Sequence, residues 1–130
     1  MSERNFEYRT ETGDRPAYKE HPLWIEAMAM THAAYDLADR VRPQDPATAR
    51  HLRRAAVAIP AHLAGALSAQ DGEERRDHVT TALISLAEVS RQLERAEKVE
   101  SAAALGLARR ARDLERATRF ELGDAGARVC

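Results

Sequence analysis

The side chains in this sequence that are best suited to chemistry are its histidines. They are His21, His32, His51, His62 and His78. A di-iron helical bundle needs Glu-x-x-His pairs together with further inward-facing glutamates, and no histidine here follows a glutamate at that spacing. Met28 and His32 lie one helical turn apart and could hold a soft metal ion. We favour ordinary packing for this pair, because methionine commonly fills gaps in a core. The sequence therefore predicts no metal site and no cofactor.

Nucleophilic catalysis has no better support. Cys130 is the only cysteine and the last residue of the sequence, with no base fixed beside it. Ser85 and Ser90 lack a neighbouring His–Asp arrangement. The six glycines are scattered, so no glycine-rich loop is available to bind a phosphate. We expect a protein without enzymatic activity.

Two groups of arginines could contact the phosphates of a nucleic acid. Arg50, Arg53 and Arg54 cluster beside His51. The second group recurs at steps of three and four residues, which places four guanidinium groups on one helix face. It consists of Arg109, Arg112, Arg116 and Arg119. RNA or DNA is thus one candidate partner.

The alternative is a solvated helix face on which the arginines pair with nearby acids. The candidate acids are Asp113, Glu115, Glu94 and Glu97. With 20 basic and 21 acidic residues the chain has a formal net charge of -1, so it lacks the basic field that favours non-specific nucleic-acid binding. We favour the solvated face.

The length and composition indicate one all-helical domain. A chain of 130 residues has room for a single domain with a full hydrophobic core. One cysteine cannot form an intrachain disulfide, which suits a reducing cytosol. No apolar run approaches the roughly 18 residues of a membrane span, and the charged N-terminus is unlike a signal peptide. We expect a cytoplasmic protein with no membrane partner.

Apolar residues recurring at three- and four-residue steps predict four helices. The helices span about residues 22–41, 46–68, 73–98 and 101–122, with Asp45 and Ser101 as candidate N-caps and Gly123 as the stop. Short turns between them favour an antiparallel up-down four-helix bundle over residues 21–123. We expect a flexible N-terminal tail over 1–20 and a C-terminal tail over 124–130.

Pro60 lies inside the second predicted helix. It lacks a backbone donor, so it should free the carbonyl of Ala56 and kink the helix. In the next helix, Glu88 lies near the core edge and needs a partner, for which Arg54 is the candidate. We interpret this carboxylate as half of a structural pair.

Some apolar residues fall off the predicted core stripes. In the first helix the predicted stripe includes Trp24, Met28 and Tyr35. The residues off the stripes are Met30, Leu37 and Leu105. Helices with more than one apolar face need a second surface to cover them, which is compatible with an oligomer.

The segments LRRAAVAIPAHLAGAL, residues 52–67, and LISLAEVSRQL, residues 83–93, together with Trp24 near the start of the first helix, resemble a known family. This is the bacterial four-helix bundle family named after proteins encoded in 23S ribosomal RNA intervening sequences. The positions that match its motif most closely are Arg53, Arg54, Ile59, Pro60 and Glu88. Four positions depart from it: Ala58 stands where the family has serine, His62 for asparagine, Gly65 for glutamate and Ala66 for glycine.

The resemblance implies a ring-shaped assembly, typically a homopentamer, without known catalysis. Relatives include accessory proteins of diversity-generating retroelements, which bind nucleic acid and a reverse transcriptase. We therefore expect a non-enzymatic homo-oligomeric scaffold whose first partner is itself. An unidentified protein partner, or nucleic acid bound through the arginines, stays open.

Overall fold

The computed structural model describes residues 17–123, and these form four long helices. The helices are α1 (Pro22–Val41), α2 (Pro46–Ser68), α3 (Gly72–Ala96) and α4 (Ser101–Thr118). A short 3-10 helix, η1 (Ala17–Glu20), precedes α1, and a π-helical segment, η2 (Arg119–Gly123), continues α4. Over this range there is no strand, so the predicted all-α class is confirmed.

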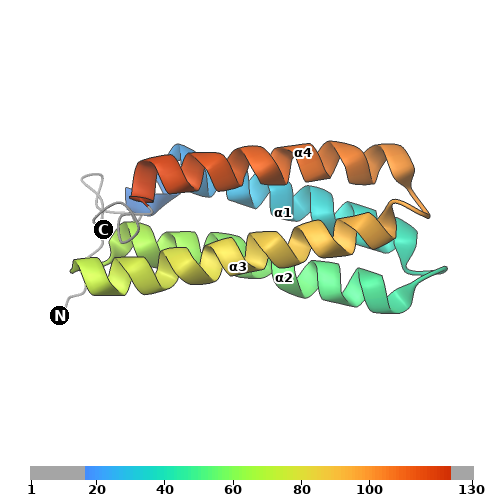
Figure 1. Cartoon of the computed structure of the whole chain (residues 1–130), viewed down its shortest axis with the longest axis horizontal. Helices are drawn as coiled ribbons and strands as arrows, with labels where there is room; N and C mark the ends of the chain where they lie inside the picture. Colours follow the sequence, from blue (N-terminus) through green and yellow to red (C-terminus); the bar gives the residue numbers. More distant parts are fainter. Residues whose placement is uncertain (1–16, 124–130) are drawn as a thin grey trace.

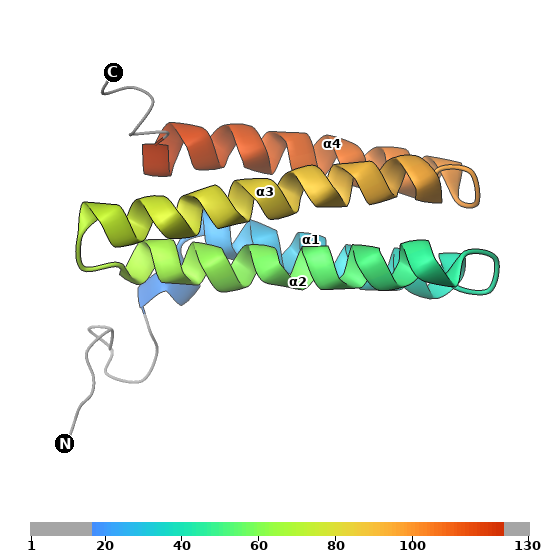
Figure 2. The same cartoon turned by 60° about the horizontal axis from the view of Figure 1, so that its bottom comes forward.

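Each helix packs antiparallel to the one before it (Figures 1 and 2). The main contacts join α1 to α2, α2 to α3, α3 to α4, and α4 back to α1, like the sides of a square. The predicted up-down four-helix bundle is therefore confirmed. In this arrangement the α2–α3 edge and the α1–α4 edge lie on opposite sides of the molecule.

The helix boundaries follow local capping chemistry. The carboxylate of Asp45 accepts hydrogen bonds from the backbone N–H of Thr48, at 3.1 Å, and from its hydroxyl, at 2.6 Å, so this predicted N-cap is confirmed. Ser101 is the first residue of α4 rather than its cap; Glu100 precedes the helix and makes no side-chain capping bond. Gly123 ends η2 with a φ of 83°, a conformation that glycine adopts without strain.

Residues 17–20, which the prediction assigned to the tail, pack against the bundle. The η1 helix contacts both α1 and α2. Within it, the ring of Tyr18 meets the ring of Trp24 edge to face, with centroids 5.5 Å apart. The rest of the predicted tails, residues 1–16 and 124–130, lies outside the described residues, as does Cys130.

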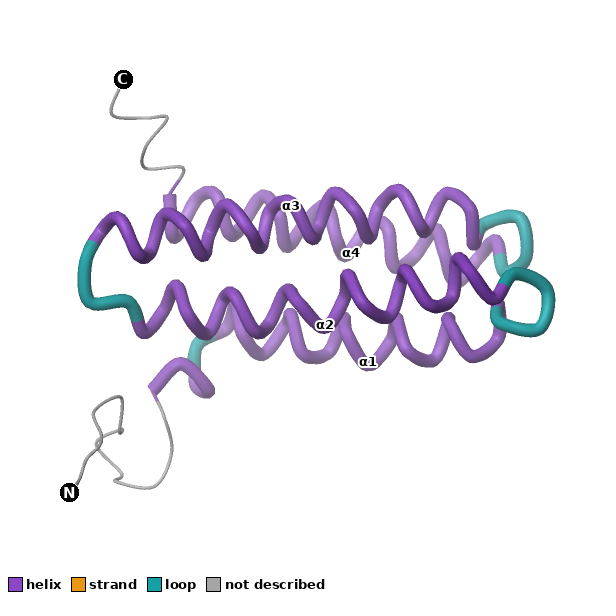
Figure 3. Tube along the Cα trace, turned by 90° about the horizontal axis from the view of Figure 1, so that it is seen from below, coloured by secondary structure: helices purple, strands orange, loops and turns teal. Residues whose placement is uncertain are grey.

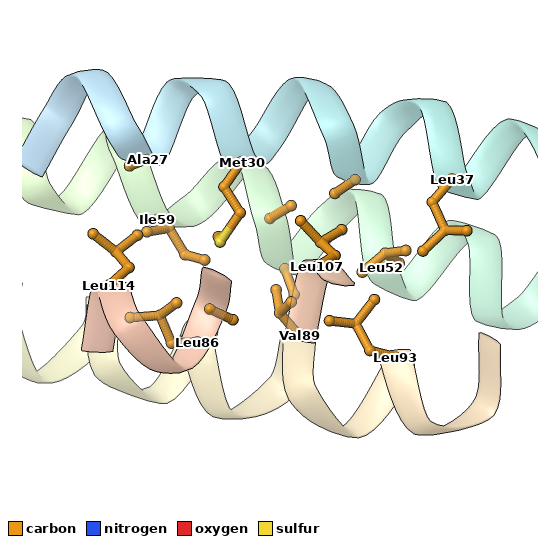
Figure 4. Packing of buried hydrophobic residues seen from close by; sticks show 14 of the residues in the cluster. Ala27, Met30, Leu37, Leu52, Ile59, Leu86, Val89, Leu93, Leu107 and Leu114 are labelled. Atoms are coloured by element: carbon orange, nitrogen blue, oxygen red, sulfur yellow. The ribbon is translucent and has the colours of Figure 1, made fainter. Parts of the chain in front are cut away.

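Buried apolar side chains from all four helices meet in one hydrophobic core, part of which is seen in Figure 4. Met30 and Leu37 are completely buried there, so their predicted placement off the core stripe is wrong. The buried stripe of α1 instead excludes Trp24, Met28 and Tyr35, which are only partly buried. Of the three off-stripe residues, Leu105 alone is exposed.

Helix α2 continues through Pro60 to Ser68 as one helix. Proline cannot donate to the carbonyl of Ala56, and the hydroxyl of Thr31 on α1 lies 3.1 Å from that oxygen. The same hydroxyl is 2.8 Å from the carbonyl oxygen of Ala27, so its one proton serves both acceptors. Thr31 is buried. Its hydroxyl therefore supplies, from the neighbouring helix, the donor that Pro60 cannot provide to the Ala56 carbonyl.

Candidate functional site

The four arginines of the predicted α4 stripe are all exposed, as the helical spacing requires. The guanidinium of Arg116 pairs with Asp113 at 3.2 Å, and that of Arg119 pairs with Glu115 at 3.2 Å. Both pairs are made along the helix itself. No ion pair within residues 17–123 involves Arg109 or Arg112. The stripe is thus half neutralised by acids of its own helix.

The structure separates the three clustered arginines of α2. The guanidinium of Arg53 lies over the ring of Tyr35, 4.8 Å from its centroid, and 3.5 Å from a carboxylate oxygen of Asp39. Arg53 therefore ties α2 to α1 through a cation–π contact and an ion pair. Arg50 is exposed, and Arg54 lies on the α2–α3 edge of the bundle.

A shallow groove of about 590 Å³ follows the α2–α3 edge. These two helices lie side by side along their length (Figure 3). The groove, called here the α2–α3 groove, combines basic, polar and apolar side chains. Those that define it are His51, Arg54, Ile84, Glu88, Arg91 and Arg95. Ile84 is 62% exposed there, the most exposed aliphatic side chain among the large apolar residues that the described part of the chain leaves at its surface.

Glu88 does not pair with Arg54, contrary to the prediction. Its carboxylate accepts hydrogen bonds from Arg91 and, at 2.7 Å, from the amide of Gln92. The hydrogen bond from Gln92, and to a lesser extent the one from Arg91, holds the pKa of Glu88 below its ordinary value. The two donors lie three and four residues along the same helix, so they reach the carboxylate without crossing the groove.

Arg91 and Arg95 are groove residues that the sequence reasoning did not single out. A signal for Arg91 was present, because the short turn at Asp71 fixes the register of the two antiparallel helices. Arg54 and Glu88 each lie 17 residues from Asp71, and His51 and Arg91 each lie 20 residues from it. Counting outward from the turn places Arg91 at the level of His51 and Glu88 at the level of Arg54, whereas it gives no such partner for Arg95.

A second groove of about 310 Å³ follows the opposite, α1–α4 edge. Small residues line much of it: Ala33, Ala102, Ala103 and Gly106. A side chain added at Gly106 would meet open space. Leu105 beside it is 48% exposed. Charged side chains of Asp36, Arg40 and Arg110 also line the groove. This α1–α4 groove therefore combines small side chains with charged ones and has one large apolar neighbour.

Two further predicted residues are structural. Ile59 is completely buried in the core, and Pro60 is buried beside it. Among residues 17–123, no three His, Cys, Asp or Glu side chains come close enough to hold a metal ion together. Within the same range no helix combines the length and the hydropathy of a membrane span.

The fold and surface define a four-helix bundle protein whose distinctive features are two grooves and several exposed apolar side chains. A model of the 23S rRNA-intervening sequence protein family matches residues 19–118. The chain belongs to that family. Searches of curated proteins and of solved structures give no match.

Proposed function

We propose that this protein is a non-enzymatic, cytoplasmic homo-oligomeric scaffold, assembled as a ring that is most simply a pentamer. The observation that carries the proposal is the pair of grooves on opposite edges of the bundle. One edge presents the exposed Ile84, and the other presents small side chains flanked by charged ones. Among the described residues, Ile84 is one of several large apolar side chains that the single chain leaves exposed, and subunit contacts at the two edges would cover Ile84 and Leu105.

Two different surfaces suit a head-to-tail assembly. In such an assembly the first surface of one copy meets the second surface of the next, and the chain of copies closes into a ring when the rotation between them allows it. The small side chains at Ala102, Ala103 and Gly106 leave room for a large side chain such as Ile84 from a neighbour. Closure at five copies is what the family resemblance suggests.

Cysteine cross-linking tests which surfaces meet. In a Cys130→Ser background, a chain that carries both Ile84→Cys and Gly106→Cys should form a ladder of disulfide-linked multimers under mild oxidation. Chains with only one of the two substitutions should stay uncross-linked, because a head-to-tail interface never brings residue 84 of one copy to residue 84 of another. Dimers from either single-cysteine chain would contradict the head-to-tail arrangement. Non-reducing electrophoresis reads out both results.

Nucleic-acid binding is the second candidate function. It is favoured by one observation: Arg109 and Arg112 are exposed and form no ion pair within residues 17–123. Guanidinium groups in this state can contact phosphates without first losing a protein partner.

For this candidate we expect Arg112→Glu together with Arg116→Glu to weaken binding to RNA hairpins and DNA duplexes by similar factors, whatever their sequence. The logarithm of the association constant falls linearly with the logarithm of the salt concentration. The magnitude of that slope should decrease by roughly 0.9 for each phosphate that the variant no longer neutralises. Arg42→Glu is the matched control, because Arg42 is an exposed arginine away from the stripe. Fluorescence anisotropy over a salt series measures both effects. Unchanged affinity and slope in the double variant would remove the stripe as the binding surface.

A further inference from the structure

The imidazole rings of His62 on α2 and His78 on α3 face each other across the α2–α3 edge. Their Nδ1 atoms are 3.1 Å apart, and the ring centroids are 5.3 Å apart. Both side chains are half-buried, so solvent reaches them while their positions are constrained by packing. At this distance the two rings form a hydrogen bond in which one Nδ1 carries the proton and the other accepts it.

Gly65 makes this arrangement possible. A Cβ atom at that position would lie 2.6–2.7 Å from three atoms of the His78 ring, closer than packed atoms tolerate. The ring of His78 therefore occupies the space that a side chain at residue 65 would fill. His62 and Gly65 are two of the four positions where the chain departs from the family motif, so this histidine pair is a feature of the individual sequence.

The spacing of the two nitrogens matches that of two ligands on one transition-metal ion. With Zn–N bonds of about 2.0–2.1 Å, two nitrogens of a tetrahedral site lie about 3.3–3.4 Å apart. In a square-planar Cu²⁺ site, with bonds of similar length, they lie about 2.9 Å apart. The observed 3.1 Å falls between these values, so only a small ring movement separates the hydrogen-bonded pair from a chelating pair.

We propose that His62 and His78 together bind one divalent transition-metal ion of the Zn²⁺ or Cu²⁺ type through their Nδ1 atoms. The donating ring shifts its proton from Nδ1 to Nε2, so both Nδ1 lone pairs become free without a change in charge. No third protein ligand is present within residues 17–123, and water fills the remaining coordination positions. The ion links α2 to α3 near the turn that joins them.

The test uses the full-length chain without a polyhistidine tag. Equilibrium dialysis against Zn²⁺ alone should give one ion per chain, and Cu²⁺ added in its place should give a paramagnetic resonance spectrum with coupling to two nitrogens. His62→Ala and His78→Ala should each weaken binding by roughly a hundredfold, because the remaining histidine loses the advantage of a linked partner. His32→Ala is the matched control: an exposed histidine on α1 whose removal should change nothing.

Gly65→Ala supplies a variant that keeps both histidines. Its Cβ must displace the His78 ring from the position that it holds beside His62, so binding should weaken although the helical circular dichroism stays that of the parent. Absence of saturable binding in the parent chain, binding that survives both histidine substitutions, or undiminished binding in Gly65→Ala would each overturn the proposal. The stoichiometry is counted per chain, so these results do not depend on whether the chain assembles.

Discussion

If the proposed ring forms, Ile84→Arg is expected to convert it into monomers while leaving the bundle folded. Ile84 is 62% exposed in the isolated chain, so an arginine there extends into solvent and leaves the core packing unchanged. At a subunit interface, the same arginine would have to lose its hydration beside Arg54 and Arg91, which also line the α2–α3 groove. The interface would also forgo the roughly 1.5–3 kcal/mol that a fully buried isoleucine contributes. In a ring this effect recurs at every interface.

The control for this substitution is Gln70→Arg. It adds the same charge at an exposed residue in the turn between α2 and α3, outside the lining of the groove. Light scattering should report a monomer for Ile84→Arg and the parental mass for Gln70→Arg, with the same helical circular dichroism for both. An Ile84→Arg chain that keeps the parental mass would show that the α2–α3 groove is not a subunit interface.

Thr31→Val should lower the free energy of unfolding by about 1–3 kcal/mol, the usual effect of leaving a buried polar group unsatisfied. Valine has nearly the shape of threonine but lacks the hydroxyl, so the carbonyl of Ala56 loses the donor that Thr31 provides. Pro60 cannot replace it, since its nitrogen carries no hydrogen. Urea denaturation measures the change.

A double-mutant cycle with Pro60→Ala isolates the cause. Alanine at position 60 restores a backbone N–H for the Ala56 carbonyl, so Thr31→Val should cost measurably less in that background, with a coupling of at least ~0.5 kcal/mol. Thr81→Val is the matched control, because the Thr81 hydroxyl donates 3.1 Å back to Asp77 on its own helix at an exposed site. That variant should stay within about 0.5 kcal/mol of the parent. Equal costs for Thr31→Val in the two backgrounds would contradict a donor role for Thr31.

Most of the fold could be predicted from the sequence, because proline, Asp45 and glycine mark the helix ends and the helices are long. The stripe of α1 was harder. Apolar residues cover more than half of that helix, so the 3.6-residue period fits two overlapping faces. The structure buries the face with Met30 and Leu37 and leaves Trp24 and Tyr35 at the boundary.

The candidate site was less predictable, because it depends on which of several possible partners a side chain reaches. Arg91 is near Glu88 in sequence, and Arg54 lies opposite Glu88 in the register of the two helices. Spacing alone therefore does not show which arginine pairs with the carboxylate. The carboxylate pairs with Arg91, which needs no crossing of the groove. Likewise, Pro60 predicted a free carbonyl at Ala56, but the donor on α1 follows only from how the two helices pack.

The mass of the full-length chain in solution is the most direct test of the proposed scaffold. It should be measured by light scattering at micromolar concentration, at low and high salt, with the ratio of absorbance at 260 and 280 nm recorded. A ring-forming scaffold predicts a particle of five times the 14.4 kDa chain mass that persists at high salt and carries no nucleic acid. A stable monomer at that concentration would contradict the proposed assembly. A particle that sheds nucleic acid as salt rises would instead favour nucleic-acid binding through the arginine stripe as the function.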